Sequence, residues 1–372
     1  MISAHRSRGL AATALAVAAL LAGCASQSAA EKAAEAEAAR IAAEIAARTP
    51  PPMGLNADVV EAASIYVAFS RDMAAIEGGF GTPEEIQAAL RRGAAYEPVQ
   101  LSRGLVAYAA VVALQSPEFV QGVRQYANDR DTRRRLADNI VADPRWASHL
   151  PGADAAAGLI ISTLRVDIDA LNAAAGRIEN DAYAVQGDAR RSWAIRPVAD
   201  REGRLADAKA RSALPMSPSA PDAARLLAAA GSGTGLGLSG DRLRTPPYPP
   251  AVVQALAIAA LAALGEADDS ARTAALQNDP VSQTCLTESK LNLFQCLAAS
   301  RPNYEDVFCI GRHVVRDIAT CTRGAAQPAP TVTVSPVRAA PPRIAVAPGG
   351  LDAPAPQPSP PPGATPETPP TR

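Results

Sequence analysis

Residues 160–185, IISTLRVDIDALNAAAGRIENDAYAV, form the stretch that decides the fold. Its apolar residues recur at steps of three and four, as the face of a helix in a bundle or an antiparallel coiled coil requires. These residues are Ile160, Leu164, Ile168, Leu171, Ala175, Ile178, Ala182 and Val185. We expect residues 188–214 to be the partner in a long helical hairpin, because this segment carries a second apolar set, Trp193, Ile195, Val198 and Leu205. The pattern predicts an all-α helical bundle.

Residues 101–114, upstream of this stretch, are apolar nearly all round. A helix without a polar face must be surrounded, so this segment is the predicted centre of the core. Two neighbouring helices are predicted to start at Thr82-Pro83 and Ser116-Pro117, where a capping residue precedes a proline. We therefore expect residues 56–214 to form the main helical domain.

The segment 215–250 is rich in Pro, Gly and Ser, which predicts a linker between domains. The apolar run 251–264 then opens a smaller helical unit, residues 251–324, which contains four cysteines. Asp279-Pro280 predicts the start of one helix in this unit. Asn303, three residues before Asp306, can cap the next helix.

The four cysteines of this unit are Cys285, Cys296, Cys309 and Cys321. If two antiparallel arms meet at a turn near Pro302-Asn303, Cys285 faces Cys321 and Cys296 faces Cys309. We expect this nested pairing among the three possible ones. Cys285 and Cys296 are eleven residues apart, about three helical turns, whereas the twelve residues from Cys309 to Cys321 need a local adjustment. The hairpin resembles the coiled-coil-helix family of twin-cysteine proteins, but the cysteine spacing differs and no function carries over.

The N-terminus carries Arg6 and Arg8, an apolar run over residues 10–21, and the sequence Leu21-Ala22-Gly23-Cys24. A charged start followed by an apolar run and small residues is the pattern of a secretory signal. The final four residues resemble the lipobox of bacterial lipoproteins. The resemblance implies that residues 1–23 are a signal peptide and that Cys24 is the lipidation site. We then expect a protein in the cell envelope, anchored to the outer membrane and facing the periplasm.

Other interpretations of this N-terminus are an ordinary cleaved signal and a membrane-spanning helix with a chance cysteine. The apolar run is shorter than the roughly 20 residues that cross a bilayer, which disfavours the second alternative. The even number of remaining cysteines agrees with an oxidising compartment outside the cytoplasm.

Two segments are predicted to lie outside the folded core. Residues 24–55 form the anchor and an Ala/Glu-rich helical tether, with only Ile41 and Ile45 as an apolar stripe before the prolines at 50–52. Residues 325–372 are rich in Pro and Ala and have few large apolar residues, which predicts a disordered tail.

The formal net charge is −1, with acidic and basic residues interspersed, so we expect no nucleic-acid partner. The arginines at 133–135 follow Asp129 and Asp131 and are typical of a solvated helix face. The partners that we expect are the membrane, through the lipid, and an envelope protein or cell-wall material.

No linear catalytic motif is present, and we expect no enzymatic activity, cofactor or metal. His149 and His313 lack a neighbouring motif, and a zinc site at the cysteines would need thiolates that oxidation removes. The glycine-rich run 231–237 lacks the Gly-Lys-Ser/Thr ending of a phosphate-binding loop. Asp167 and Asp169 lie two apart on a predicted helix and therefore face different sides.

The chain is also similar to uncharacterised lipoproteins of alphaproteobacteria, through Gly104-Leu105-Val106-Ala107-Tyr108 and Ser116-Pro117-Glu118-Phe119-Val120. This resemblance implies no activity. Our leading hypothesis is a lipid-anchored envelope protein of structural or interaction type. The alternative is an enzyme or small-ligand binder with a site in an interhelical groove, which a polar pocket with several convergent carboxylates or arginines would favour.

Overall fold

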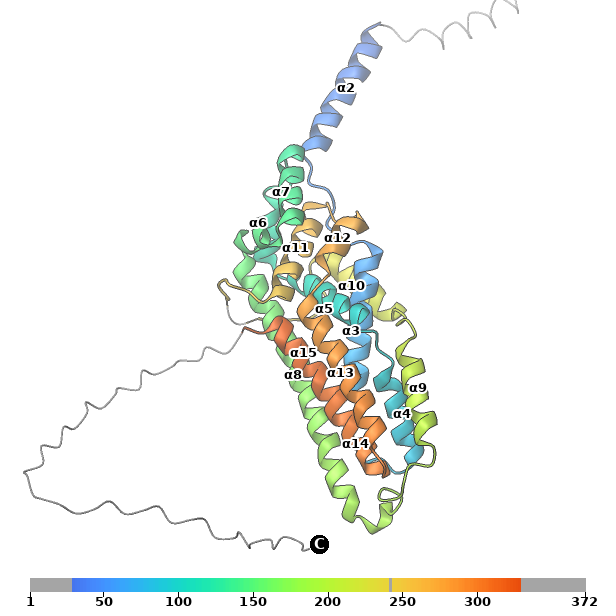
Figure 1. Ribbon diagram of the computed structural model, residues 1–372. Coiled ribbons are helices and arrows are strands. Elements are labelled where there is room, and N and C mark those ends of the chain that lie inside the picture. The colour runs from blue at the N-terminus through green and yellow to red at the C-terminus, as the bar shows by residue number, and fades with distance from the viewer. Residues whose placement is uncertain (1–28, 241–242, 329–372) are drawn as a thin grey trace, which may run out of the picture. The chain divides into compact units, whose positions relative to one another are not determined.

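The computed structural model describes residues 29–240 and 243–328, and within them the regular elements are helices (Figure 1). This confirms the predicted all-α class. The predicted signal peptide, Cys24 and residues 329–372 of the predicted tail lie outside the described residues. No helix in the described part of the chain is long and apolar enough to cross a membrane.

The α-helices are α2 (Ala29–Arg48), α3 (Ala57–Ala74), α4 (Pro83–Ala94), α5 (Pro98–Ala113), α6 (Pro117–Arg124), α7 (Arg130–Ala142), α8 (Ala153–Ala184), α9 (Arg201–Ser212), α10 (Ala220–Ser232), α11 (Pro250–Leu264), α12 (Ser270–Leu276), α13 (Pro280–Ala299), α14 (Asn303–Ile310) and α15 (Asp317–Ala326). Short 3-10 helices are η1 (Pro144–His149), η2 (Val185–Gly187) and η3 (Ala189–Arg191), and η4 (Gly311–Arg316) is a π-helix.

Helix α5 lies at the centre of the core, as its composition predicts. From Leu101 to Leu114 every residue except Arg103 is buried, and α3 and α11 pack along the helix. A Cβ at Gly104 would lie 2.5 Å from the carbonyl oxygen of Ala62, so the glycine allows α3 and α5 to approach closely.

The predicted helix starts are present at the expected residues. Thr82 Oγ1 accepts a hydrogen bond from the Glu85 amide at 3.3 Å, and Ser116 Oγ accepts one from the Phe119 amide at 3.4 Å. Asp279 caps α13 through the amides of Val281 and Ser282. In each case the proline occupies the first helical position, where no amide hydrogen is needed.

The partner of α8 differs from the predicted one. Residues 188–214 form η3, an irregular segment and α9, and α9 packs against α4 and α13. The partner of α8 is the C-terminal arm, residues 303–326, which comprises α14, η4 and α15. The 12 residues of α9 span only about 18 Å, whereas the 32 residues of α8 span about 48 Å, so a longer partner covers the apolar face better.

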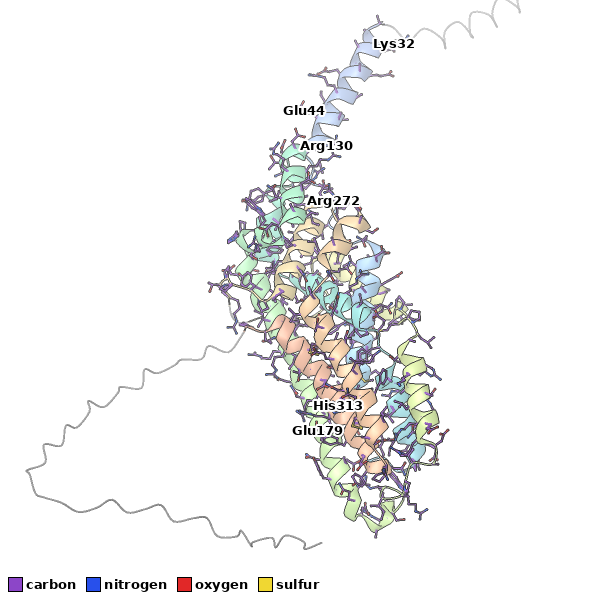
Figure 2. The ribbon with its side chains drawn as sticks, viewed as in Figure 1. Lys32, Glu44, Arg130, Glu179, Arg272 and His313 are labelled. Carbon is purple, nitrogen blue, oxygen red and sulfur yellow. A yellow bond between two sulfur atoms is a disulfide. The ribbon has the colours of Figure 1, made fainter. Side chains whose placement is uncertain are left out.

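The packing of α8 against the C-terminal arm includes an ion pair and a close approach at a glycine. The Arg316 guanidinium binds the Glu179 carboxylate, with Nε 2.6 Å from Oε1 and Nη2 2.8 Å from Oε2. Figure 2 labels Glu179 on α8 and His313 on the arm. A Cβ at Gly311 would lie 2.9 Å from Glu179 Cγ, so the glycine lets the π-helix approach α8 closely.

Helices on both sides of the predicted linker contribute to one contiguous hydrophobic core. Helix α11 packs on α5, and α10, which lies within the predicted linker, packs on α3 through buried Leu226, Ala229 and Ala230. The proline- and glycine-rich segment therefore connects helices that share one core. Outside it, every described side chain of α2, residues 29–45, is exposed.

Candidate functional site

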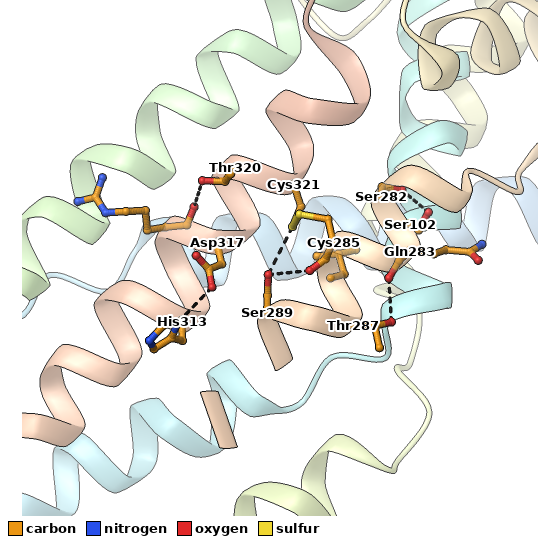
Figure 3. Close-up of a disulfide and its surroundings, with 12 residues drawn as sticks. Ser102, Ser282, Gln283, Cys285, Thr287, Ser289, His313, Asp317, Thr320 and Cys321 are labelled. Atoms are coloured by element: carbon orange, nitrogen blue, oxygen red, sulfur yellow. Dashed lines mark hydrogen bonds and ion pairs between the residues drawn. A yellow bond between two sulfur atoms is a disulfide. The ribbon is translucent and has the colours of Figure 1, made fainter. Parts of the chain in front are cut away.

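The C-terminal hairpin consists of α13 and the C-terminal arm, joined by two disulfides. Cys285 is bonded to Cys321 and Cys296 to Cys309, with Cα–Cα distances of 5.5 and 5.8 Å. These pairs match the nested arrangement expected from the antiparallel arms. Figure 3 shows the outer bridge, where Ser289 Oγ donates to the Cys285 carbonyl oxygen at 2.8 Å and lies 3.5 Å from Cys321 Sγ.

The π-helix η4 lies between the two cysteines of the C-terminal arm. A π-helix accommodates an extra residue relative to regular α-helical turns. It therefore supplies the local adjustment that the twelve-residue spacing from Cys309 to Cys321 requires, so that both sulfur atoms face α13.

The turn of the hairpin is held by residues 193–200, which we call the strap, and by Arg201 at the start of α9. Its backbone bonds include the Val198 amide to the Arg301 carbonyl oxygen at 2.8 Å and the Tyr304 amide to the Ala194 carbonyl oxygen at 3.0 Å. The Arg201 guanidinium donates to carbonyl oxygens at the C-terminal end of α13, including that of Ser300 at 2.7 Å. The strap thus replaces the helix predicted for this segment and fixes the hairpin turn.

Asn303 and Asp306 do not form the predicted local cap. Helix α14 begins at Asn303 with Pro302 at the N-cap and no side-chain capping bond. The Asn303 side-chain nitrogen Nδ2 donates instead to the carbonyl oxygens of Trp193 and Arg196, at 3.1 and 3.0 Å. Because the hairpin turn is buried against the strap, the Asn303 side chain bonds to strap carbonyl oxygens and not to the first turn of its own helix.

Asp306 forms a buried ion pair with Arg204 of α9, with side-chain exposures of 0 and 3%. The Arg204 Nη1 donates to Asp306 Oδ1, and Nη2 donates to the Leu297 carbonyl oxygen. Asp306 also accepts from Ser300 Oγ at 2.7 Å and from Gln87 Nε2 at 3.2 Å. The Arg204 Nε is also buried, and it has no hydrogen-bond partner among the described residues. The cluster joins α4, α9 and both arms of the hairpin.

A groove of about 410 Å³ lies between α4 and α9, above this buried pair. The two helices lie side by side in Figure 1. Its lining residues are Pro83, Glu84, Gln87, Arg91, Val198, Ala199, Asp200, Gly203, Arg204, Asp207 and Asn303. At one end, Arg91 Nε donates to Asp207 Oδ2 at 2.7 Å and bridges the two helices. The lining thus brings together the carboxylates of Glu84, Asp200 and Asp207 and the guanidinium groups of Arg91 and Arg204.

A second polar cluster lies inside the bundle, between α3, α5 and α8. The rings of Tyr66 and Tyr108 stack with their centroids 5.7 Å apart, and Tyr66 Oη and Ser70 Oγ are buried without a hydrogen-bond partner. Burial raises the pKa of Asp167 to about 6, and the positive charge of nearby Arg71 offsets only part of this increase. Burial, reinforced by the Asp167 charge, also raises the pKa of Tyr108 to about 12.

Lys290 of α13 is buried against the loop between α4 and α5. Its Nζ donates to the Tyr96 carbonyl oxygen and lies 4.1 Å from the centre of the Tyr96 ring. Nζ also lies 3.4 Å from the carbonyl oxygen of Ser212, at the end of α9. Burial lowers the pKa of Lys290 to about 8, while the charge of Glu97 opposes this change.

The remaining residues singled out in the sequence lie apart from these clusters. Cys24 lies outside the described residues. His149 ends η1 on the surface, and His313 lies 3.3 Å from Asp317 Oδ2 on the C-terminal arm (Figure 3). Asp167 is largely buried whereas Asp169 is exposed, so the two carboxylates face different sides. The described residues contain no group of His, Cys, Asp or Glu arranged to hold a metal ion.

No pattern in the sequence indicates Arg204, Lys290 or the groove, and the pattern around Asp306 predicts only a helix cap. One available signal is the rarity of lysine, since Lys32, Lys209 and Lys290 are the lysines of this chain. Arg204 has no comparable signal, because it is one of many arginines on helices.

Compared with protein families, curated proteins and solved structures, the chain matches none of them.

Proposed function

We propose that this protein is a lipid-anchored component of the cell envelope that acts by interaction and not by catalysis. Cys24 carries the lipid, and the folded body contacts an envelope protein or cell-wall material on the periplasmic side of the outer membrane. The observation that carries this proposal is the pair of disulfides within the core, where Cys309 and Cys321 are buried. Structural disulfides belong to oxidising compartments, which supports export.

Helix α2 supports the same proposal as a spacer between the anchor and the body. Its 20 residues span about 30 Å. Its described side chains are exposed, and its alanines and glutamates favour a helix without needing a packing partner. A spacer of this kind holds an interaction domain away from the bilayer surface.

The anchor is tested by the substitution Cys24→Ser in the full chain. We expect wild-type protein in the membrane fraction, with an N-terminal lipid detected by mass spectrometry. The variant should lose the lipid and enter the soluble fraction, with its two disulfides and its thermal unfolding unchanged. An intact leader on cytosolic protein with all four distal thiols reduced would contradict the proposal.

The interaction role is tested by crosslinking in intact cells, followed by capture of the wild-type chain from membranes. We expect the same envelope protein or cell-wall fragment to be recovered in repeated captures. Repeated recovery of neither would count against an interaction role, although lipidation could still be correct.

The groove between α4 and α9 favours a second candidate function, small-ligand binding. It brings together Glu84, Asp200, Asp207, Arg91 and Arg204, the convergence of charged groups that a binding site needs. Binding in this groove is compatible with the anchored role, because a partner can be recognised through a short segment placed there.

A further inference from the structure

We propose that Arg204, Asp306 and Ser300 form a register clamp, which places the hairpin turn so that the four cysteines pair in the nested arrangement. The inference concerns how the chain acquires its disulfides and goes beyond the interaction role proposed above. It does not rest on that role, because the pairing can be tested in purified protein without a partner.

Four cysteines allow three pairings, and helical geometry by itself rejects one of them. Cys285 and Cys296 lie on the same helix, α13, eleven residues apart. That separation is about 16 Å along the helix axis, which is too long for a disulfide. The same holds for Cys309 and Cys321 on the C-terminal arm. The crossed pairing, in which each cysteine of α13 bonds the other cysteine of the arm, depends on where the chain turns.

Each crossed bond requires a turn at a different residue. Leu297 lies twelve residues from both Cys285 and Cys309, so antiparallel arms that join these cysteines must turn near Leu297. The middle of the other crossed bond falls at residues 308–309. In the folded chain both points lie inside helices, α13 and α14, and the turn comes between them. Fixing the turn therefore selects the pairing.

The register clamp holds the chain close to both of these points. Arg204 Nη2 donates to the Leu297 carbonyl oxygen, and Nη1 donates to Asp306 Oδ1, within one helical turn of residues 308–309. Ser300 Oγ, in the turn itself, donates to the same carboxylate at 2.7 Å. A turn at either alternative point would break these bonds and separate the buried Asp306 charge from its counter-ion, which is strongly unfavourable.

Arg204 can fix this register because it belongs to neither arm of the hairpin. Its helix, α9, packs against α4 and α13 and is joined to α4 by the Arg91–Asp207 ion pair. Lys209 Nζ of α9 also lies 5.9 Å from the centre of the Phe294 ring on α13. These contacts do not involve either disulfide, so Arg204 positions both arms relative to a third element of the fold.

The disulfides tolerate only a small error in this register. Their Cα–Cα distances, 5.5 and 5.8 Å, lie inside the range of about 4.4–6.8 Å that a disulfide spans. Sliding one arm by a single helical turn, about 5.4 Å, moves each Cα pair to about 8 Å apart. The clamp and the two disulfides require the same register, so each stabilises the state in which the other forms.

Thiol–disulfide exchange makes this preference measurable. Each bond forms when two cysteine thiols give two electrons and two protons to a disulfide oxidant, which is released as two thiols. In a buffer of reduced and oxidised glutathione the bonds open and close repeatedly. The pairing then reaches the arrangement of lowest free energy.

The test uses the full chain purified from its own membranes in detergent and equilibrated in this glutathione buffer. Free thiols are then blocked, and the chain is cut with trypsin and the protease Glu-C. Cuts at Lys290, Glu305 and Arg312 separate the four cysteines from one another. Mass spectrometry of the unreduced peptides gives the ratio of non-nested to nested bonds.

The main variant is Arg204→Met with Asp306→Leu, which removes the clamp without leaving either charge buried. We expect its ratio of non-nested to nested bonds to rise by about tenfold or more, which corresponds to about 1.4 kcal/mol of register preference. Ser300→Ala removes one bond to the Asp306 carboxylate and keeps the ion pair, so its ratio should rise by about threefold.

The matched control is Ile140→Ala on the buried face of α7, which packs against α11, α12 and η1. Loss of stability alone increases the unfolded population, in which any cysteines can pair. Each variant is therefore equilibrated at the same interval below its own unfolding temperature. Because Ile140 is remote from the hairpin, the control ratio should stay within about twofold of the wild-type value.

The double variant decides, and Ser300→Ala decides only if the double variant does not fold. A rise in the ratio that the control does not show supports the proposal. An unchanged ratio, or an equal rise in the control, overturns it. Neither outcome depends on the lipid at Cys24, so failure of the clamp proposal is distinguishable from failure of the anchored role.

Discussion

Arg204 and Asp306 lie 102 residues apart in the sequence and form an ion pair with almost no solvent exposure. The pair ties α9, which follows the strap, to α14, which opens the C-terminal arm. Because Asp306 also accepts from Ser300 and Gln87, four segments of the chain converge on one carboxylate. The hairpin turn and the floor of the α4–α9 groove therefore depend on the same contact.

Breaking this pair from one side should be strongly destabilising. Arg204→Met leaves the Asp306 charge buried without its counter-ion, and we expect a loss of about 3–5 kcal/mol in the free energy of unfolding. Replacing both residues, as Arg204→Met with Asp306→Leu, should recover part of this loss. Urea unfolding of the non-reduced protein measures both. Arg91→Met, at the half-exposed pair with Asp207, is the control and should cost about 1 kcal/mol or less. Equal losses in Arg204→Met and the control would contradict the role of the buried pair.

Removing either disulfide should destabilise the chain by about 2–4 kcal/mol, through the greater freedom of the unfolded state. The loss should be larger for Cys285→Ser with Cys321→Ser than for Cys296→Ser with Cys309→Ser. The first disulfide joins residues 36 positions apart, whereas the second joins residues 13 positions apart. Unfolding measurements test the order. Peptide mapping without reduction, after thiols are blocked during lysis, tests the pairing itself. Recovery of Cys285 linked to Cys296 would show the nested arrangement to be wrong.

Asp167 should make stability fall as the pH rises from about 4 to 6. Its folded pKa, about 6, lies above the ordinary value of 3.8, so the folded state binds more protons in this window. Stability from the neutral carboxyl is therefore present at low pH and lost as the pH rises through 6. Asp167→Asn should stabilise the protein by about 1–3 kcal/mol at pH 8 and by little at pH 4. Thermal unfolding at both pH values measures this. The exposed neighbour serves as control, and Asp169→Asn should have no such pH-dependent effect.

Lys290 should make stability rise between about pH 8 and 10.5. Its folded pKa is about 8, below the ordinary 10.5, so in this window the unfolded state binds more protons and the free energy of unfolding increases with pH. Urea unfolding at pH 7.5, 9 and 10 should show that Lys290→Met removes this rise. Lys209→Met, at an exposed lysine near Phe294, should retain it. An identical pH profile for wild type and Lys290→Met would rule out the buried lysine as its source.

Much of the fold was predictable because it depends on neighbours in the sequence. The uniformly apolar composition of residues 101–114 requires burial, and the proline starts at Pro83, Pro117 and Pro280 require only a cap within the same turn. The cysteine pairs were predictable because the number of residues between each cysteine and the hairpin turn decides which cysteines lie opposite each other on two antiparallel helices. The groove was not predictable, because its charged residues belong to helices whose contact no local pattern specifies.

The sequence by itself determined where α4, α6 and α13 begin, which helix is central and which cysteines face each other, since these depend on helical periodicity and local capping. Only the tertiary structure decided which helix covers α8, and it selected the C-terminal arm over residues 188–214 because the arm is long enough to bury that apolar face. It also decided the roles of Asn303 and Asp306. A buried side chain takes the partner that best satisfies it, and here those partners are residues of the strap and of α9, distant in the sequence.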